Sequence, residues 1–306
     1  MKLDKMVKRF RIDKPKKFRL SDIDPRDTCG LDLNKEEGKL LIAERIDTLA
    51  KRQEMLYAQD SWSVLALFQA MDTAGKDGVI KHVMSGINPQ GCEVHAFKAP
   101  GPEALDHDFL WRAAQRLPER GRIGIFNRSY YEEVLVVRVH PDLLKPQKLP
   151  DKVVGKAFWK ERFKSIRAFE RHLVRNGTKI LKFHLRISKE EQRQRFLDRL
   201  DDPGKRWKFS MGDVVERGRW DDYMAAYEDM IRETSTPEAP WYVIPADDKW
   251  FARLMVSAAM VDALEDLDLS YPKVANTPEL RQVREALLNE GAGPAAIKKA
   301  GKDKAA

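Results

Sequence analysis

The sequence has few cysteines and no long apolar segment, and both absences narrow the class of protein. Its 306 residues include two cysteines, Cys29 and Cys92, which are too few for a disulfide framework and do not form a metal-binding spacing. It has no run of about 18 apolar residues, the length that crosses a membrane. The first twenty residues also lack the apolar core of a secretory signal. We therefore expect a cytoplasmic protein with reduced thiols and no membrane partner.

The charge balance is basic. The formal net charge is +8, charged residues make up 34% of the chain, and hydrophobic residues make up 42%. This hydrophobic content is typical of a folded globular protein. The positive excess suits a polyanionic partner, such as nucleic acid, anionic lipid or a phosphate-rich small molecule. It is equally compatible with an ordinary solvated surface, so charge alone does not decide between these interpretations.

Short apolar runs alternate with helical patterns along the chain. Five runs are expected to be strands: Val64–Phe68, Val94–Phe97, Ile123–Phe126, Lys179–Leu185 and Trp241–Pro245. Helices are expected between them, over Asp151–Asn176, Glu190–Leu200 and roughly Lys249–Leu267. This alternation predicts an α/β fold with a mainly parallel five-stranded sheet covered on both faces. Ligands of such sheets bind beyond the carboxyl ends of the strands.

The two ends of the chain are expected to lie outside this domain. Residues 1–35 are charged and indicate an extended N-terminal arm, whereas residues 273–306 end in EGAGPAAIKKAGKDKAA, which lacks large apolar side chains. The prediction is a domain over 36–272 between this arm and a partly disordered C-terminal tail.

The segment FQAMDTAGKDG, Phe68–Gly78, follows the first expected strand and opens a helix over Gly78–Ser85. It resembles a phosphate-binding Walker A loop in which Ala70 replaces the first glycine and Asp77 replaces Ser/Thr. Gly75 lets the backbone approach an anion, and the first amide groups of the helix favour negative charge. Lys76 adds a full positive charge. The alternative is an ordinary strand-to-helix turn with a surface pair between Asp77 and Lys81.

Asp72 lies inside this loop. Because the position of the usual Mg²⁺-binding hydroxyl is occupied by Asp77, Asp72 is the candidate hard oxygen ligand for Mg²⁺ beside the phosphates. The alternative is a carboxylate that stabilises the turn through its own backbone.

A second polar loop follows the third strand, at the place of the second acidic (Walker B) motif of P-loop proteins. Asn127 stands there in place of an aspartate, and Glu132 is a candidate source of the missing negative charge. Arg128 can clamp two phosphoryl oxygens at once. A buried Arg–Glu pair within one loop is the structural alternative.

A basic segment, Asp201–Asp213, interrupts the helical patterns after the fourth strand. Lys205, Arg206 and Lys208 stand close together and alternate with Trp207 and Phe209. The segment suits a mobile lid around residues 200–220 that brings charge over a transferring phosphate. Nucleic-acid binding and a solvated loop with two core anchors remain alternatives.

Taken together, these segments resemble the polyphosphate kinase 2 family over roughly residues 20–270. The segments that carry the resemblance are Gln69–Gly78, Ile80–His82, Gly86–Gly91, Phe126–Glu132, Val137–Pro141, Lys182–Phe183, Lys205–Ser210, Thr234–Pro237 and Ala239–Ala246. The pair Asn127 and Glu132 resembles the class III subgroup, which takes AMP and ADP. Most other members have Asp at the position of Asn127 and no Glu at that of Glu132.

The resemblance implies a three-layer α/β/α P-loop kinase fold with a helical lid, and Mg²⁺-dependent phosphoryl transfer between inorganic polyphosphate and AMP, ADP or ATP, with GMP and GDP as open alternatives. It also implies a homo-oligomer, a dimer or tetramer, with no nucleic-acid partner. The implied catalytic residues are Asp72, Lys76, Asn127, Arg128, Glu132, Arg206 and Lys208. The implied polyphosphate-binding residues are Ala74, Gly75, Lys76, Asp77, Gly78, Lys81 and Arg128. Arg112 and Glu132 are expected to bind the nucleotide, and Asp72, Asn127 and Glu132 the metal.

Two other functions remain open from the sequence. An ATP-dependent nucleotide kinase would normally keep the first loop glycine and the Ser/Thr after the lysine, and this sequence keeps neither. A non-enzymatic nucleic-acid-binding protein would not require Asp72 beside Lys76, and its binding would depend steeply on salt.

Overall fold

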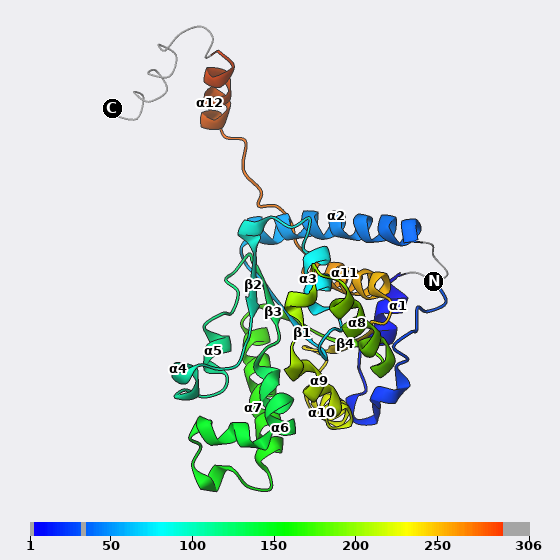
Figure 1. The fold of residues 1–306 in the computed structure, drawn as a ribbon. Helices are drawn as coiled ribbons and strands as arrows, with labels where there is room; N and C mark the ends of the chain where they lie inside the picture. Colours follow the sequence, from blue (N-terminus) through cyan, green and yellow to red (C-terminus); the bar gives the residue numbers. More distant parts are fainter. Residues whose placement is uncertain (1–2, 32–34, 290–306) are drawn as a thin grey trace. The chain divides into compact units, whose positions relative to one another are not determined.

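The computed structural model describes residues 3–31 and 35–289, which fall into two compact units, Met1–Ser270 and Tyr271–Ala306. The first unit contains the sheet and the helices around it (Figure 1). The described part of the second unit contains one helix, α12 (Pro278–Leu288).

A five-stranded parallel sheet forms the centre of the first unit. Its order is β2-β3-β1-β4-β5. The strands are β1 (Ser63–Gln69), β2 (Cys92–Ala96), β3 (Ile123–Asn127), β4 (Thr178–Arg186) and β5 (Trp241–Pro245). All five expected strands are therefore confirmed. In the register, Phe68 of β1 pairs with Asn127 of β3, and Gln69 pairs with His184 of β4.

Helices cover both faces of the sheet, as expected for a three-layer fold (Figure 1). One layer contains α1 (Leu3–Phe10), α2 (Lys35–Gln59), α3 (Lys76–Val83) and α11 (Lys249–Glu265), in which α11 packs against the other three. The other layer contains α6 (Val136–Val139), α7 (Phe158–Arg175) and α10 (Trp220–Thr234).

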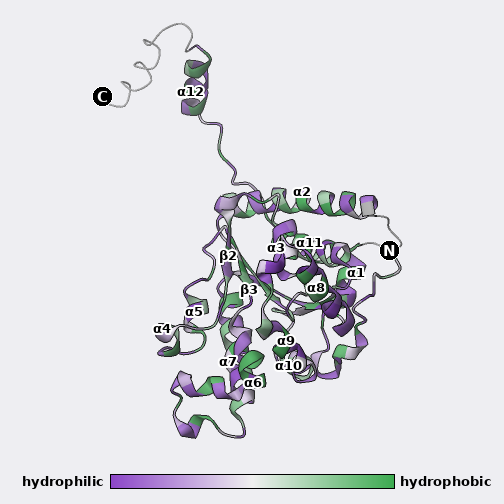
Figure 2. Cartoon of the chain, in the orientation of Figure 1, coloured by the Kyte–Doolittle hydropathy of each residue, from purple (hydrophilic) through white to green (hydrophobic). Residues whose placement is uncertain are grey.

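Burial explains why these segments form these elements. Every residue of β1 and β5 is buried, as the continuously apolar strand runs require. The edge strand β2 is partly exposed. Helix α2 carries hydrophilic and hydrophobic residues in turn along its length (Figure 2), which suits a helix that packs on α11 with one face.

The remaining elements are short or lie outside the layers. The helices are α4 (Pro102–Leu105), α5 (Trp111–Ala114), α8 (Lys189–Asp201) and α9 (Met211–Gly218). The 3₁₀ turns are η1 (Pro15–Lys17), η2 (Leu20–Asp22), η3 (Pro89–Gly91), η4 (Tyr130–Val134), η5 (Pro141–Gln147), η6 (Asp151–Val153) and η7 (Arg206–Lys208).

The N-terminal segment differs from the expected extended arm. Residues 3–10 form α1, and its Met6, Val7 and Phe10 are buried in the core. The ring of Phe10 meets that of Phe251 on α11 edge-to-face at 5.8 Å. The many charged residues of this segment obscured a short amphipathic helix, because its four apolar residues are few but share one face.

Two further expectations need correction or comment. The helix expected from Asp151 begins at Phe158, and Asp151–Val153 is a 3₁₀ turn. In the expected C-terminal tail, Pro278–Leu288 is helical, and residues 290–306 lie outside the described residues. Among the helices described, none is both long enough and apolar enough to cross a membrane.

Candidate active site

The loop between β1 and α3 has the backbone of an anion-binding turn. Thr73 and Gly75 have positive φ angles of 62° and 99°, and Gly75 is the N-cap of α3. The helix therefore begins at Lys76, two residues before the expected start at Gly78. Its first amide groups, which have no partner within the helix, are available to an anion in front of the loop.

The side chain of Lys76 lies in the middle of this loop. Its Nζ donates to Ala70 O at 2.7 Å and to Met71 O at 3.3 Å. Burial lowers the pKa of Lys76, and the nearby carboxylate of Asp72 opposes that shift. The ammonium is therefore held beside the loop, where it can act on a phosphate group.

Two side chains of α8 hold the loop from behind. Gln192 Nε2 donates to Asp72 O at 3.1 Å, and Arg195 Nη1 donates to Thr73 O at 3.1 Å. Arg195 also donates to the carbonyls of Ala246 and Asp247 beyond β5. These bonds tie the left-handed backbone at Thr73 to α8 and to the end of β5.

The loop after β3 contacts the loop between β1 and α3, which we call the phosphate loop. Asn127 Nδ2 donates to Asp77 Oδ1 at 2.6 Å. Arg128 Nη2 donates to Asp72 Oδ1 at 2.8 Å, and its Nη1 lies 3.4 Å from Glu132 Oε2. Arg128 thus stands between the phosphate loop and η4, with one carboxylate on each side.

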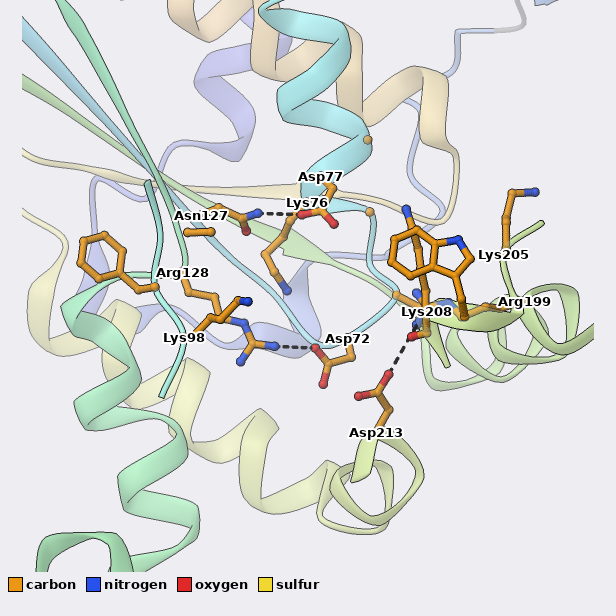
Figure 3. A pocket seen from close by; sticks show the side chains of 16 residues that line it. Asp72, Lys76, Asp77, Lys98, Asn127, Arg128, Arg199, Lys205, Lys208 and Asp213 are labelled. Atoms are coloured by element: carbon orange, nitrogen blue, oxygen red, sulfur yellow. Dashed lines mark hydrogen bonds and ion pairs between the residues drawn. The ribbon is translucent and has the colours of Figure 1, made fainter. Parts of the chain in front are cut away.

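The first candidate cavity, of about 630 Å³, opens in front of the phosphate loop (Figure 3). Six cations and three carboxylates line it, an excess of three positive charges. These residues are Lys76, Lys98, Arg128, Arg199, Lys205, Lys208, Asp72, Asp77 and Asp213. A pocket with this balance suits a polyanionic ligand.

A second cavity, of about 260 Å³, adjoins the first and is mainly apolar. The two cavities share Phe97, Lys98 and Arg128. Arg112 and Glu132 line the second cavity, and its apolar residues come from 97–105 and 136–146. A mainly apolar cavity with a few charged groups in its wall suits a nucleoside and its phosphate.

Most of the expected site residues converge in these cavities. Asp72, Gly75, Lys76, Asp77, Gly78, Asn127, Arg128 and Lys208 line the first cavity, whereas Arg112 and Glu132 line the second. The other three lie elsewhere. Ala74 is a buried residue of the loop itself. Lys81 is exposed outside both cavities, and Arg206 donates to Leu200 O and does not line the first cavity.

Sequence reasoning missed three charged residues of the first cavity. Lys98 enters it from the chain that follows β2, Arg199 from α8 and Asp213 from α9. Arg199 Nη1 lies 3.4 Å from Asp213 Oδ2 (Figure 3). The rule that ligands bind at the carboxyl ends of parallel strands could have indicated Lys98, because it comes two residues after β2.

The oxygen donors of the site fit a divalent metal that arrives with phosphates. Among the described residues, no three His, Cys, Asp or Glu side chains are arranged to hold a metal by themselves. Asp72, Glu132 and Asp213 do line one further cavity of about 260 Å³ at the edge of the site. Mg²⁺ typically binds one or two carboxylates together with substrate phosphates, so this donor set is adequate.

The fold and this site define a class of protein. A parallel sheet with an anion-binding loop between β1 and α3, and a second polar loop after the neighbouring β3, is the architecture of the P-loop phosphotransferases.

The comparisons with known proteins narrow this class. The family model described as Polyphosphate kinase 2 (PPK2) matches residues 32–272. An ADP-polyphosphate phosphotransferase of Rhodopseudomonas palustris is 55% identical over 258 residues, 83% of this chain and 89% of the relative. An AMP/ADP-polyphosphate phosphotransferase of Meiothermus ruber is 46% identical over 273 residues, 89% of this chain and 98% of the relative.

A solved structure supports the same family assignment. The crystal structure of polyphosphate kinase 2 from Arthrobacter aurescens TC1 superposes with a TM-score of 0.84 at 41% identity, covering 93% of this chain and 96% of that chain. The chain belongs to the polyphosphate kinase 2 family, and the expected α/β P-loop kinase fold is confirmed.

Proposed function

We propose that this protein transfers the terminal phosphate of inorganic polyphosphate to AMP and to ADP, reversibly and with Mg²⁺. The two relatives described above are named for transfer between polyphosphate and ADP, or AMP and ADP. Family membership supports the polyphosphate-dependent kinase activity itself.

The observation that carries the proposal is the pair of adjoining cavities that share Arg128. The first cavity is lined by an excess of cations, as a phosphate polymer without base or ribose requires. The second is mainly apolar with Arg112 and Glu132 in its wall, as an acceptor nucleotide requires. Arg128 stands between them, where a phosphoryl group would pass from donor to acceptor.

In this reaction, an oxygen of the nucleotide's terminal phosphate attacks the end phosphorus of polyphosphate. A new P–O bond forms, the bond to the bridging oxygen breaks, and the polymer leaves one phosphate shorter. No general base is needed, since the attacking oxygen is already anionic. Catalysis is then mainly positioning and charge neutralisation. Lys76 and Arg128 would neutralise the transferring phosphoryl group, which is supported by their position in the wall of the first cavity.

Asp72 is the proposed first ligand of Mg²⁺, with Asn127 and Glu132 beside it. The Asp72 carboxylate and the Asn127 amide line the first cavity, whereas Glu132 lines the further cavity that also contains Asp72. When bound, the ion would neutralise phosphate oxygens and orient the polymer.

The choice of both AMP and ADP rests on Asn127 and Glu132, the pair that resembles the class III subgroup. Glu132 lines the second cavity next to Arg128, which supports a role near the terminal phosphate of the acceptor. This proposal gives Glu132 a role in holding acceptors that differ by one phosphate.

The test is an assay of the purified protein with long-chain polyphosphate, Mg²⁺ and either AMP or ADP. Products are separated chromatographically, and each component is omitted in turn. We expect ADP and ATP from AMP, and ATP from ADP, only when polyphosphate and Mg²⁺ are present. Transfer to AMP that requires ATP and ignores polyphosphate would instead identify an ordinary nucleotide kinase. Salt-sensitive oligonucleotide binding without any transfer would identify a nucleic-acid-binding module.

A further inference from the structure

The segment between α6 and α7 forms one wall of the second cavity without a buried residue of its own. Every residue from 141 to 157 is exposed or half-buried. Leu143, Pro146 and Gln147 of η5 nevertheless line the second cavity, and Gln147 also lines a smaller adjoining cavity of about 70 Å³. Because apolar burial gives this wall little support, its position depends on polar contacts with the core.

Gln147 makes these contacts. Its Nε2 donates to Glu133 Oε2 at 2.7 Å, and its Oε1 accepts from Arg162 Nη2 at 2.6 Å. Arg162 Nη1 also donates to Glu133 Oε2 at 2.6 Å, so the three side chains close a ring. In the described structure, the other side-chain contact between this segment and the rest of the chain is the ion pair of Lys148 with Asp106, which are both exposed.

The two partners of Gln147 are fixed in the core. The side chains of Arg162 on α7 and Glu133 in η4 are only 5% and 6% exposed. The guanidinium of Arg162 lies over the rings of Phe109 and Phe158, at 4.6 and 4.8 Å from their centres. A buried carboxylate beside a buried guanidinium suits a group that donates and accepts at the same time, and a side-chain amide is such a group.

We propose that Gln147 is a positioning residue of the acceptor site, which holds η5 against the buried Glu133–Arg162 pair and so keeps this wall of the second cavity in place for AMP and ADP. This inference rests on the proposed function, because it takes the second cavity as the site of the acceptor nucleotide. No residue of the segment 141–157 lines the first cavity. Polyphosphate binding should therefore be independent of Gln147.

Gln147→Met tests this role, because methionine is similar in length but lacks the amide donor and acceptor. Glu133 and Arg162 keep their own 2.6 Å bond in this variant, so the melting temperature should change little. We expect KM for AMP and for ADP to rise about fivefold or more, with kcat and the KM for polyphosphate unchanged within about twofold. Initial rates with each substrate varied in turn measure this difference.

A matched control lies two residues away. Lys145 is exposed, pairs with Asp142 inside the same segment and lines neither cavity. Lys145→Met should leave all of these kinetic constants unchanged, because an exposed ion pair contributes little. Equal KM values for AMP in the two variants would overturn the positioning role of Gln147.

Limited digestion with trypsin gives a second measurement that does not require activity. Arg281 and Arg284 on α12, which belongs to the other unit, provide reference cleavage sites. Relative to these sites, cleavage within the segment should be about fivefold faster in Gln147→Met than in the wild-type protein. Saturating AMP should slow this cleavage in the wild-type protein. The exposed lysines of the segment are Lys145, Lys148, Lys152 and Lys156.

The possible outcomes separate this inference from the function on which it rests. Absence of polyphosphate-dependent transfer in the wild-type protein would reject the proposed function, whereas faster cleavage of Gln147→Met and protection by AMP would still support Gln147 as the residue that holds a nucleotide-binding wall. Faster cleavage with unchanged KM for AMP and ADP would overturn the proposal, because Gln147 would then have a structural role alone. No protection by AMP would overturn it as well. If Gln147→Met does not fold, Gln147→Asn, whose amide is on a shorter side chain, is measured in the same way.

Discussion

At the scale of single residues, the proposed mechanism depends most on two charged groups of the loop between β1 and α3, Asp72 and Lys76. Asp72 contacts Arg128 at 2.8 Å, and Lys76 is held by the loop carbonyls. We predict that Asp72→Asn and Lys76→Ala each lower kcat by about a hundredfold or more, on the order of 3 kcal/mol in activation free energy. Steady-state ATP formation from ADP and polyphosphate measures this.

A lysine at the far end of the sheet provides the control for that prediction. Lys179, near the start of β4, pairs with Asp266 at 3.0 Å, and both line a separate cavity away from the phosphate loop. Lys179→Ala should keep the wild-type kcat. Near-normal turnover in both Asp72→Asn and Lys76→Ala would remove these residues from the mechanism.

His184 gives the fold a predictable dependence on pH. It is buried at 1% exposure, its two ring nitrogens have no hydrogen-bond partner within the described structure, and it packs on Tyr227. Burial lowers its pKa from 6.5 to about 3. Between these values the unfolded chain binds a proton that the folded chain does not, so the free energy of unfolding falls as pH falls. The expected loss from pH 7 to pH 5 is about 2 kcal/mol.

Urea denaturation at both pH values tests this for the wild-type protein and for His184→Leu. The variant should show a smaller pH dependence, because the group that takes up the proton only in the unfolded state is gone. His172 is exposed on α7, and His172→Gln should leave the dependence unchanged. Equal slopes in the wild-type protein and His184→Leu would show that other groups cause the pH effect.

At the scale of elements, a buried network of hydrogen bonds holds η4 against α7 and β4. The hydroxyl groups of Tyr130 and Tyr131 donate to Glu170 Oε1 on α7 at 2.9 and 2.6 Å. Lys182 of β4 donates to Glu170 Oε2 at 2.6 Å and to Thr234 O at 2.7 Å. Because Glu132 lies in η4, this network connects the segment that contains Glu132 to a strand and two helices. The network also explains why a lysine, Lys182, stands in the middle of the apolar strand β4, because its ammonium group is paired there.

Two cations of the basic segment Asp201–Asp213, which look equivalent in the sequence, differ in where their side chains lie. Lys208 lines the first cavity, whereas Arg206 donates to Leu200 O outside it. We predict that Lys208→Ala raises KM for polyphosphate about fivefold, equivalent to about 1 kcal/mol. Arg206→Ala, the matched control two residues away, should change KM less than twofold. Initial rates over a range of polyphosphate concentrations, at constant ionic strength, measure both. Equal increases in KM in the two variants would mean that polyphosphate binding depends on the total charge of this segment and not on the position of Lys208.

At the scale of the whole molecule, the two ends of the chain have different relations to the core. Residues from Tyr271 onward form a separate unit, whereas Phe10 near the start is completely buried. We predict that a chain ending at Ser270 keeps its melting temperature and its kcat within twofold. Phe10→Ala should instead lose about 3–5 kcal/mol of unfolding free energy, since it leaves a large cavity beside Phe251. Loss of activity in the shortened chain would give the C-terminal unit a role in the enzyme.

The five strands, the class of fold and the position of the loop between β1 and α3 could be predicted from the sequence. These depend on local patterns: apolar runs, and a Gly-Lys pair between a strand and a helix. The charged side chains that line the first cavity could not all be predicted, because their direction depends on the tertiary structure. In the structure, Lys98, Arg199 and Asp213 line the first cavity, whereas Lys81 and Arg206 do not. The tertiary structure also buries one face of α1, which the charged sequence of the N-terminal segment did not indicate. The physical reason is that side-chain direction and burial depend on contacts with segments far away in the chain, which a local pattern does not contain.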